Sequence, residues 1–133
     1  MSRLVEAARK YLGVRFVHRG RLPHKLDCVG LVVRAYADCG ITLPDRRDYS
    51  REPNADDFLS SIEAGLGKPV SGLEPGDVVT MKTKLHPHHL AIVTDHPHGL
   101  GLIHASGEHG KVVEHRIDDS YMKRIVRVYR RPV

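Results

Sequence analysis

Leu26-Asp27-Cys28-Val29-Gly30-Leu31-Val32 is the stretch that decides the fold, because it combines a helix start with a reactive side chain. Asp27 is a typical helix N-cap, and Gly40 supplies a typical stop signal. Between them an apolar stripe repeats at helical spacing: Val29, Val32, Val33, Tyr36 and Cys39. The sequence therefore predicts an amphipathic helix over residues 27–40, with Cys28 in its first turn.

A cysteine in the first turn of a helix is suited to nucleophilic chemistry. Unpaired backbone N–H groups and the positive end of the helix dipole favour a thiolate, which predicts a lowered pKa for Cys28 and a nucleophilic sulfur. The same N–H groups are suited to an oxyanion, and Gly30 is expected to leave room for a substrate backbone. From this motif alone, a buried structural cysteine is an equal alternative.

The second cysteine is not expected to pair with the first. Cys28 and Cys39 bracket the helix and would lie about 16 Å apart along its axis. A disulfide requires Cα atoms within roughly 7 Å of each other. Cys39 is therefore expected to be a core residue.

The rest of the chain divides into helices followed by strands. Residues 2–12 and 54–64 have the spacing and end signals of short helices, whereas residues 14–26 hold no period and are expected to be irregular surface chain. Five runs rich in β-branched residues come later: Val78–Lys82, His89–Asp95, Leu100–His104, Lys111–Ile117 and Ile125–Arg130. Their connections are too short for crossover helices.

This order predicts an α+β fold, with N-terminal helices packed on a mainly antiparallel sheet of about five strands. At 133 residues, the chain is expected to form a single domain over residues 1–133.

A cysteine nucleophile needs a base, and ten histidines compete for the role. His89 begins the most apolar strand and is expected to be held more rigidly than His86 and His88 beside it. His104 ends the next strand, so a hairpin would bring it alongside His89. Cys28, His89 and His104 then form nucleophile, general base and orienting residue.

A metal centre is the competing interpretation of the same three residues. One cysteine and two histidines resemble a three-ligand zinc site, and four further histidines add donors: His86, His88, His96 and His98. The sequence lacks the tighter H-E-x-x-H and paired C-x-x-C spacings. We therefore expect no metal at these residues.

The net charge indicates a polyanionic partner but does not identify which one. A formal charge of +5 favours polyanions, which include nucleic acid, anionic lipid and anionic cell-wall polymers. Aromatic residues are only 5%, so the combination of stacking and phosphate contacts is missing and nucleic acid is not expected as the main partner. No stretch approaches the roughly 20 apolar residues of a membrane span. Residues 1–12 lack the apolar core of a signal peptide, which predicts a protein that is cytoplasmic when made.

Four ordered motifs resemble those of the NlpC/P60 peptidases. Residues 27–32 resemble the family's D-C-S-G-L-V, and Gly40-Ile41-Thr42-Leu43-Pro44 follows as in the family. Residues 73–79 resemble L-x-P-G-D-L-V. His89-Leu90-Ala91-Ile92-Val93 resembles H-V-G-I-Y, and Ile103-His104-Ala105 resembles the later I-H-A.

The resemblance implies a papain-like fold and hydrolysis of peptide bonds in bacterial peptidoglycan stems, often between D-glutamate and diaminopimelate. By motif match it makes Cys28 the nucleophile, His89 the base and His104 the residue that orients the base. It also implies an acyl-enzyme route without metal or organic cofactor.

Two positions depart from the family pattern. Phe16, in Arg15-Phe16-Val17-His18-Arg19-Gly20, stands where relatives usually carry a tyrosine in P-Y-x-x-G-G, and phenylalanine has no hydroxyl to donate. Val29 stands where serine is common. We expect Phe16, Asp27 and Gly30 to lie against the substrate.

The closing run, residues 122–132, is most similar to members associated with phage tails and gene-transfer agents. This similarity implies tail or tail-tip partners and association with a virion or tail particle. A cytoplasmic member that trims recycled wall peptides, a catalytically silent wall-binding tail protein and a thiol acyltransferase or amidase are the alternatives.

Overall fold

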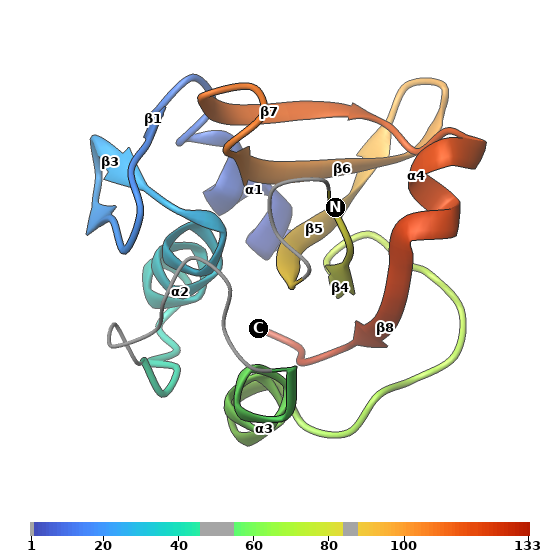
Figure 1. Cartoon of the computed structure of the whole chain (residues 1–133), viewed down its shortest axis with the longest axis horizontal. Helices are drawn as coiled ribbons and strands as arrows, with labels where there is room; N and C mark the ends of the chain where they lie inside the picture. Colours follow the sequence, from blue (N-terminus) through green and yellow to red (C-terminus); the bar gives the residue numbers. More distant parts are fainter. Residues whose placement is uncertain (1, 46–54, 84–87) are drawn as a thin grey trace.

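The computed structural model describes residues 2–45, 55–83 and 88–133 (Figure 1). Its helices are α1 (Arg3–Arg9), α2 (Cys28–Asp38), α3 (Ala55–Leu66) and α4 (Asp119–Arg124). Its strands are β1 (Arg15–Phe16), β2 (Arg21–Leu22), β3 (Lys25–Leu26), β4 (Val78–Met81), β5 (His89–His96), β6 (Gly99–Ser106), β7 (Lys111–Arg116) and β8 (Ile125–Tyr129). The α+β class is therefore confirmed.

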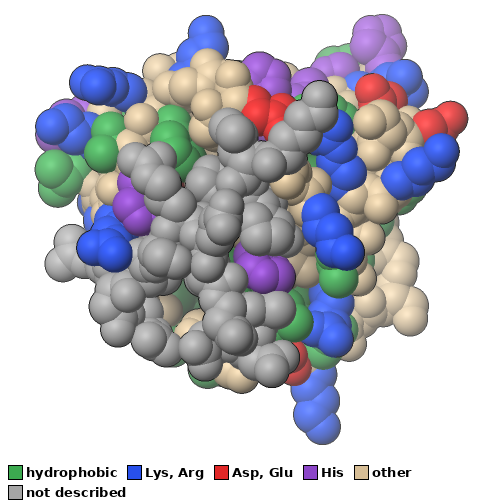
Figure 2. Space-filling view, viewed as in Figure 1, with side chains coloured by type: hydrophobic (Ala, Val, Ile, Leu, Met, Phe, Trp, Pro, Cys, Tyr) green, Lys and Arg blue, Asp and Glu red, His purple; other side chains and the backbone are tan. Residues whose placement is uncertain are grey.

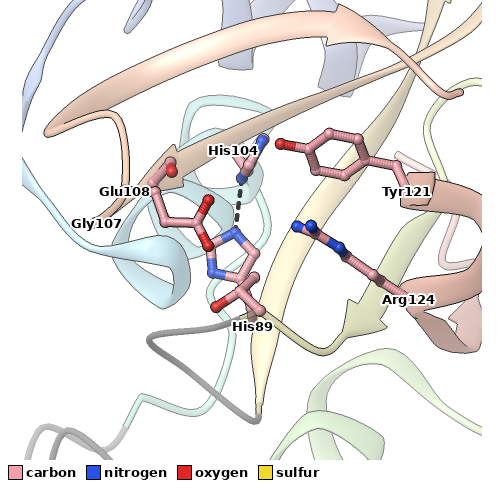
Figure 3. Close-up of a pocket in the computed structure, with 8 residues that line it drawn as sticks. His89, His104, Gly107, Glu108, Tyr121 and Arg124 are labelled. Atoms are coloured by element: carbon pink, nitrogen blue, oxygen red, sulfur yellow. Dashed lines mark hydrogen bonds between the residues drawn. The ribbon is translucent and has the colours of Figure 1, made fainter.

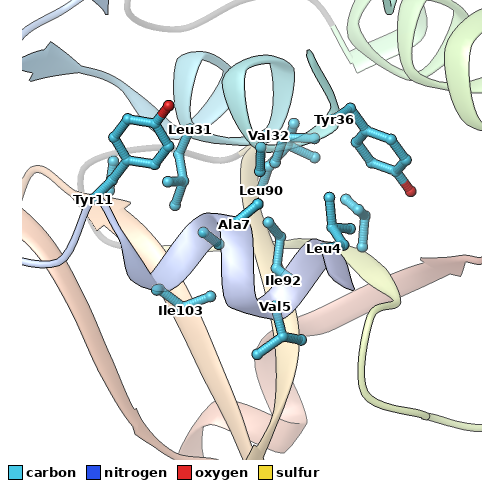
Figure 4. Close-up of a cluster of buried hydrophobic side chains, with 14 of the residues drawn as sticks. Leu4, Val5, Ala7, Tyr11, Leu31, Val32, Tyr36, Leu90, Ile92 and Ile103 are labelled. Atoms are coloured by element: carbon cyan, nitrogen blue, oxygen red, sulfur yellow. The ribbon is translucent and has the colours of Figure 1, made fainter. Parts of the chain in front are cut away.

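The strands form one curled sheet in the order β2-β3-β1-β7-β6-β5-β4-β8. At its centre, β5 and β6 form an antiparallel hairpin, and β6 continues into an antiparallel pairing with β7. Helices α1 and α2 pack against each other and against the sheet (Figure 4). The alternation of side chains along each strand sends successive residues to opposite faces, so each central strand contributes to two cores.

The larger core lies between the helices and the sheet (Figure 4). Its members come mainly from α1, α2 and the inward positions of β4 to β7, and include Leu4, Val5, Leu31, Val32, Tyr36, Leu90, Ile92 and Ile103. The smaller core covers the other face: Val79, Met81, Ala91, Val93, Leu102 and Ile117. Burial of a Leu, Ile or Val side chain contributes about 1.5–3 kcal/mol, so the larger cluster holds α1 and α2 to the sheet.

The predicted helix at Asp27 is confirmed. The Asp27 carboxylate accepts a hydrogen bond from the Gly30 N–H at 2.7 Å, which caps α2, and Gly40 follows its end with φ of 86°. Helix α1 is also confirmed, whereas the predicted cap of α3, Asn54, lies outside the described residues.

The predicted sheet of about five strands is wrong, because the described residues contain eight. The three additional strands lie within residues 14–26, which were expected to be irregular. Each has two residues, and β1 pairs with β3 in parallel. A two-residue strand shows no sequence period, so only its pairing partners define it.

Bidentate ion pairs join segments that are far apart in the sequence. Arg9 of α1 donates to both carboxylate oxygens of Glu114 in β7, at 3.0 and 2.8 Å. Arg130 donates to both oxygens of the buried Asp77 at 2.8 and 2.9 Å. Both pairs have the bidentate geometry in which arginine binds carboxylate most strongly.

Cys28 and Cys39 are both free thiols, as the helix length predicted. Among the described residues, no helix is long and apolar enough to cross a membrane.

Replacement of Gly30 by alanine tests the packing of α2. An alanine Cβ at Gly30 would overlap the backbone carbonyl of Gly20, which no rotamer can relieve. We expect Gly30→Ala to lower the free energy of unfolding by about 3 kcal/mol, measured by urea denaturation.

Gly65→Ala is the matched control, because Gly65 is also helical and its new Cβ would meet only side-chain atoms, at 3.3 Å or more. Its stability should stay within about 1 kcal/mol of the native value. Equal losses in both variants would contradict the proposed steric cause.

Candidate active site

Cys28 is the first residue of α2 and is half-buried. The backbone N–H groups of Leu90 and Val29 lie close enough to the sulfur to lower the pKa of Cys28, against the larger effect of burial. Because Leu90 follows His89 at the start of β5, the structure brings the thiol to the strand that carries the predicted base. The predicted nucleophile and the predicted base thus come from the start of a helix and the start of a strand that lie together.

The carboxylate of Asp27 holds the helix start in place. It accepts hydrogen bonds from the N–H groups of Gly30 and Arg19, at 2.7 and 3.0 Å, and pairs with the Arg21 guanidinium at 2.9 Å. Asp27 is only 3% exposed. These contacts position Cys28, and the predicted contact of Asp27 with substrate stays a prediction.

The space beside Gly30 is already occupied. The carbonyl of Gly20 fills the place where a Gly30 side chain would project, and Gly30 is buried. The prediction that Gly30 leaves room for a substrate backbone is therefore wrong: the glycine admits a neighbouring loop of the same chain. Phe16 is half-buried in β1 and packs against the larger core, and its predicted contact with substrate stays a prediction.

His89 and His104 meet as the predicted hairpin requires (Figure 3). Nε2 of His89 and Nδ1 of His104 are 2.7 Å apart, and the rings cross edge to face at an interplanar angle of 77°. The two residues are 1% and 2% exposed. A hydrogen bond of this kind fixes the orientation of the His89 ring, which is the task assigned to His104 from sequence.

A third histidine continues the line, and sequence reasoning missed its part in the site. Nε2 of His115 in β7 lies 2.8 Å from Nε2 of His104, and Nδ1 of His115 lies 3.0 Å from the carbonyl oxygen of Arg116. In the β6–β7 register, His104 faces Val113 and Leu102 faces His115. The two histidines are thus diagonal neighbours on one face, a relation that appears only once the register is known.

Burial keeps His104 neutral. The pKa of His104 is lowered to about 2, first by burial and then by the neighbouring His89, His115 and His109. A proton on this ring would be placed in a poorly solvated site beside three other imidazoles. At neutral pH His104 therefore has one N–H donor and one lone-pair acceptor.

The thiol differs from the sequence-based expectation. Burial and the charge of Asp27 raise the pKa of Cys28 to about 12, whereas the helix start alone predicted a lowered value. Hydrogen bonds from backbone N–H groups and the Arg21 charge act in the opposite direction but are weaker. Cys28 is therefore a protonated thiol in the resting protein, and a nucleophilic role would require the removal of its proton.

Helix α4, which was not predicted, supplies the outer wall. Tyr121 and Arg124 of α4 reach toward the histidines, and Glu108 comes from the loop after β6 (Figure 3). The Tyr121 ring packs against His115 with centroids 4.3 Å apart, and the Arg124 guanidinium lies 4.8 Å from the Tyr121 centroid. The pocket between them and the histidines measures about 10 Å³, close to the space of one water molecule.

The geometry does not assemble the alternative metal centre. Across residues 2–45, 55–83 and 88–133, no group of three or more histidine, cysteine or acidic side chains is arranged to hold a metal ion. His98 follows β5 and His96 ends it, at the end of the hairpin opposite to His89. His86 lies outside the described residues.

The raised pKa of Cys28 predicts how it reacts with iodoacetamide. In a Cys39→Ala background the rate should be low at pH 7 and rise about tenfold per pH unit to at least pH 10, because only the thiolate reacts. Mass spectrometry should locate the adduct on Cys28. A rate that levels off below pH 8 would instead indicate a stable thiolate–imidazolium pair.

The lowered pKa of His104 predicts acid sensitivity. Below about pH 6.5 His104 binds a proton in the unfolded chain but stays neutral in the folded protein. The contribution of neutral His104 to the free energy of unfolding is therefore complete above pH 6.5 and is lost as the pH falls toward 2. The loss is about 1.4 kcal/mol per pH unit. Denaturant unfolding of His104→Gln between pH 6.5 and 4.5 should show a shallower slope than the native chain.

The exposed His24 provides the control, because His24→Gln should retain the native slope. Parallel slopes in native and His104→Gln protein would show that the ring accepts a proton without unfolding.

Comparisons with known proteins identify the family of the chain. The family model described as the NlpC/P60 family matches residues 13–131. No curated protein sequence is similar enough to count as a match.

Solved structures share the fold. NlpC1 from Trichomonas vaginalis superposes with a TM-score of 0.67 at 21% identity, covering 98% of this chain and 43% of that one. An N-acetylmuramoyl-L-alanine amidase from Bacteroides uniformis gives 0.62 at 15% identity, with 98% and 99% covered. The peptidoglycan hydrolase RipB from Mycobacterium tuberculosis gives 0.62 at 20% identity, with 96% and 62% covered.

The chain spans less than half the length of three of the matched proteins, at 43, 39 and 46%. The family match, by contrast, extends over nearly the whole sequence and includes the segments that carry Cys28, His89 and His104. On this evidence the chain belongs to the NlpC/P60 family, a family with peptidoglycan hydrolases among its members.

Proposed function

We propose that this protein hydrolyses an amide bond in the stem peptides of bacterial peptidoglycan, with Cys28 as nucleophile and His89 as general base. The observation that carries the proposal is the 2.7 Å hydrogen bond between the buried rings of His89 and His104, beside the strand start that contacts the Cys28 sulfur. A nucleophile, a base and a residue that orients the base are the parts that acyl transfer requires.

The reaction begins with a neutral thiol. As Cys28 Sγ attacks the carbonyl carbon, the thiol proton passes to His89, and the carbonyl oxygen becomes an oxyanion. We assign that oxyanion to backbone N–H groups in the first turn of α2, which begins at Cys28, although the Gly30 N–H is already bound by Asp27. His89 then gives the proton to the leaving amine, which leaves a thioester on Cys28.

Water completes the cycle. His89 removes a proton from the water as it attacks the thioester, and then returns that proton to the departing sulfur. His104 keeps the His89 ring in one orientation through both steps, because its hydrogen bond is buried from solvent. No metal or organic cofactor is needed in this scheme.

The class of substrate is supported by the relatives and by charge. One similar structure is named a peptidoglycan hydrolase and another an N-acetylmuramoyl-L-alanine amidase, and both names refer to the same polymer. Lys and Arg side chains stand around the rim of the face in Figure 2, in keeping with a net charge of +5 and attraction to an anionic wall. We propose the bond between D-glutamate and diaminopimelate as the first to assay.

The route to the wall is a separate part of the proposal. The similarity of residues 122–132 to phage-tail and gene-transfer-agent members supports a protein that is made in the cytoplasm and carried by a tail particle. Tail-tip proteins are then its expected partners.

A catalytically silent, wall-binding protein is the second candidate. Two observations favour it: the raised pKa of Cys28, and Phe16 at the position where relatives usually carry a tyrosine hydroxyl. In that case the fold would serve recognition, and the thiol would have no catalytic part. A thiol acyltransferase or amidase would differ only in the acceptor or the bond that it attacks.

Digestion of purified peptidoglycan distinguishes these functions. The native chain and Cys39→Ala should release new amino groups at equal rates, whereas Cys28→Ala should lose at least about a thousandfold in rate. Mass spectrometry of the fragments identifies the bond, and a fragment transferred to an added amine would indicate acyl transfer.

Co-sedimentation with insoluble peptidoglycan serves as the control for folding and binding. Cys28→Ala should sediment as the native chain does. Sedimentation without any release of amino groups by the native chain would favour the silent wall-binding protein.

A further inference from the structure

Three histidine rings form a continuous line of hydrogen bonds that ends at the backbone. His89 Nε2 contacts His104 Nδ1 at 2.7 Å, His104 Nε2 contacts His115 Nε2 at 2.8 Å, and His115 Nδ1 contacts the Arg116 carbonyl oxygen at 3.0 Å. Every ring nitrogen in the line except His89 Nδ1 is therefore assigned to one of these three contacts.

The end of the line sets the position of every proton. A carbonyl oxygen has no hydrogen, so His115 Nδ1 must be the donor. In neutral His115, Nε2 is then the acceptor, which requires His104 Nε2 to donate. Neutral His104 accepts in turn at Nδ1, which requires His89 to donate from Nε2. Neutral His89 consequently carries its lone pair on Nδ1.

We propose that His115 is a positioning residue, which acts through His104 to hold the proton on His89 Nε2 and the lone pair on His89 Nδ1. This inference rests on the proposed function only in giving His89 the role of base. The tautomer itself is a property of the resting protein. A base with its proton on the wrong nitrogen cannot accept the thiol proton, and in serine proteases the wrong tautomer costs about 10⁴ in rate.

The surroundings of the line favour this single arrangement. His89 and His104 are 1% and 2% exposed, so bulk water does not compete for the ring nitrogens that contact each other. The lowered pKa of His104 supports a neutral middle ring, which is the condition for passing one tautomer along the line.

The outer ring, His115, is held by groups from two other elements. Tyr121 packs on it with centroids 4.3 Å apart, Arg124 lies over the Tyr121 ring, and both residues belong to α4. From the loop after β6, the His109 ring lies 6.3 Å from the His115 ring, and Glu108 lines the same pocket. These contacts hold the His115 ring while the Arg116 carbonyl sets its proton.

Nitrogen-15 NMR of histidine-labelled protein at pH 8 reads each tautomer directly, without substrate. In the native chain we expect the proton on Nε2 of His89, on Nε2 of His104 and on Nδ1 of His115. A native His89 that carries its proton on Nδ1 would overturn the proposal. This spectrum needs no variant, so a folding defect cannot obscure it.

Two substitutions at His115 then test its influence. His115→Phe keeps a ring for Tyr121 to pack on but removes the acceptor, so His89 should change from one tautomer to a mixture. His115→Gln restores an acceptor oxygen and should restore the native tautomer of His89. Unchanged His89 signals in His115→Phe would also overturn the proposal.

Kinetics on peptidoglycan provide the second readout. His115→Phe should lower kcat roughly 10- to 100-fold with KM changed less than about twofold, and His115→Gln should recover most of the loss. Loss of kcat with no recovery in His115→Gln would assign His115 a structural role only. Native tautomers without any peptidoglycan cleavage would contradict the proposed function and leave the inference standing.

Discussion

The buried carboxylate of Asp27 is the contact on which the rest of the site depends. A charge that is 3% exposed must be compensated, and Asp27 achieves this with two backbone N–H groups and the Arg21 guanidinium. These bonds fix the first turn of α2, and with it the thiol that lies against β5. The same charge helps to raise the pKa of Cys28, so the group that positions the thiol also helps to keep it protonated.

Much of the fold could be predicted because its signals are local. Each of these signals lies within one short stretch of sequence: the cap at Asp27, the apolar stripe that ends before Gly40, and the alternating strands on either side of the β5–β6 turn. The segments β1, β2 and β3 could not be predicted, since two residues have no period and become strands only through their partners. Helix α4 was missed because its six residues include no buried side chain.

In the candidate site, too, the contacts with local signals could be predicted and those that depend on distant segments could not. Strand alternation and one hairpin were enough to join His89 with His104, but the place of His115 depends on the register across the turn at residues 107–110. The pKa of Cys28 depends on burial by other parts of the chain, and a helix start considered alone gave the wrong direction. The space beside Gly30 was misjudged for a similar reason, because Gly20 arrives from a separate loop.

The long-range pairing of the sheet has a consequence for synthesis on the ribosome. Strand β1 pairs with β7 through Arg15 and Lys111, and the Tyr36 hydroxyl of α2 donates a hydrogen bond to the carbonyl of Arg131. A nascent chain therefore exposes Cys28 well before the strands that carry the histidines exist, and contacts of such high sequence separation form late and slowly. The candidate site therefore cannot assemble until β7, the last strand that carries one of the three histidines, has been synthesised.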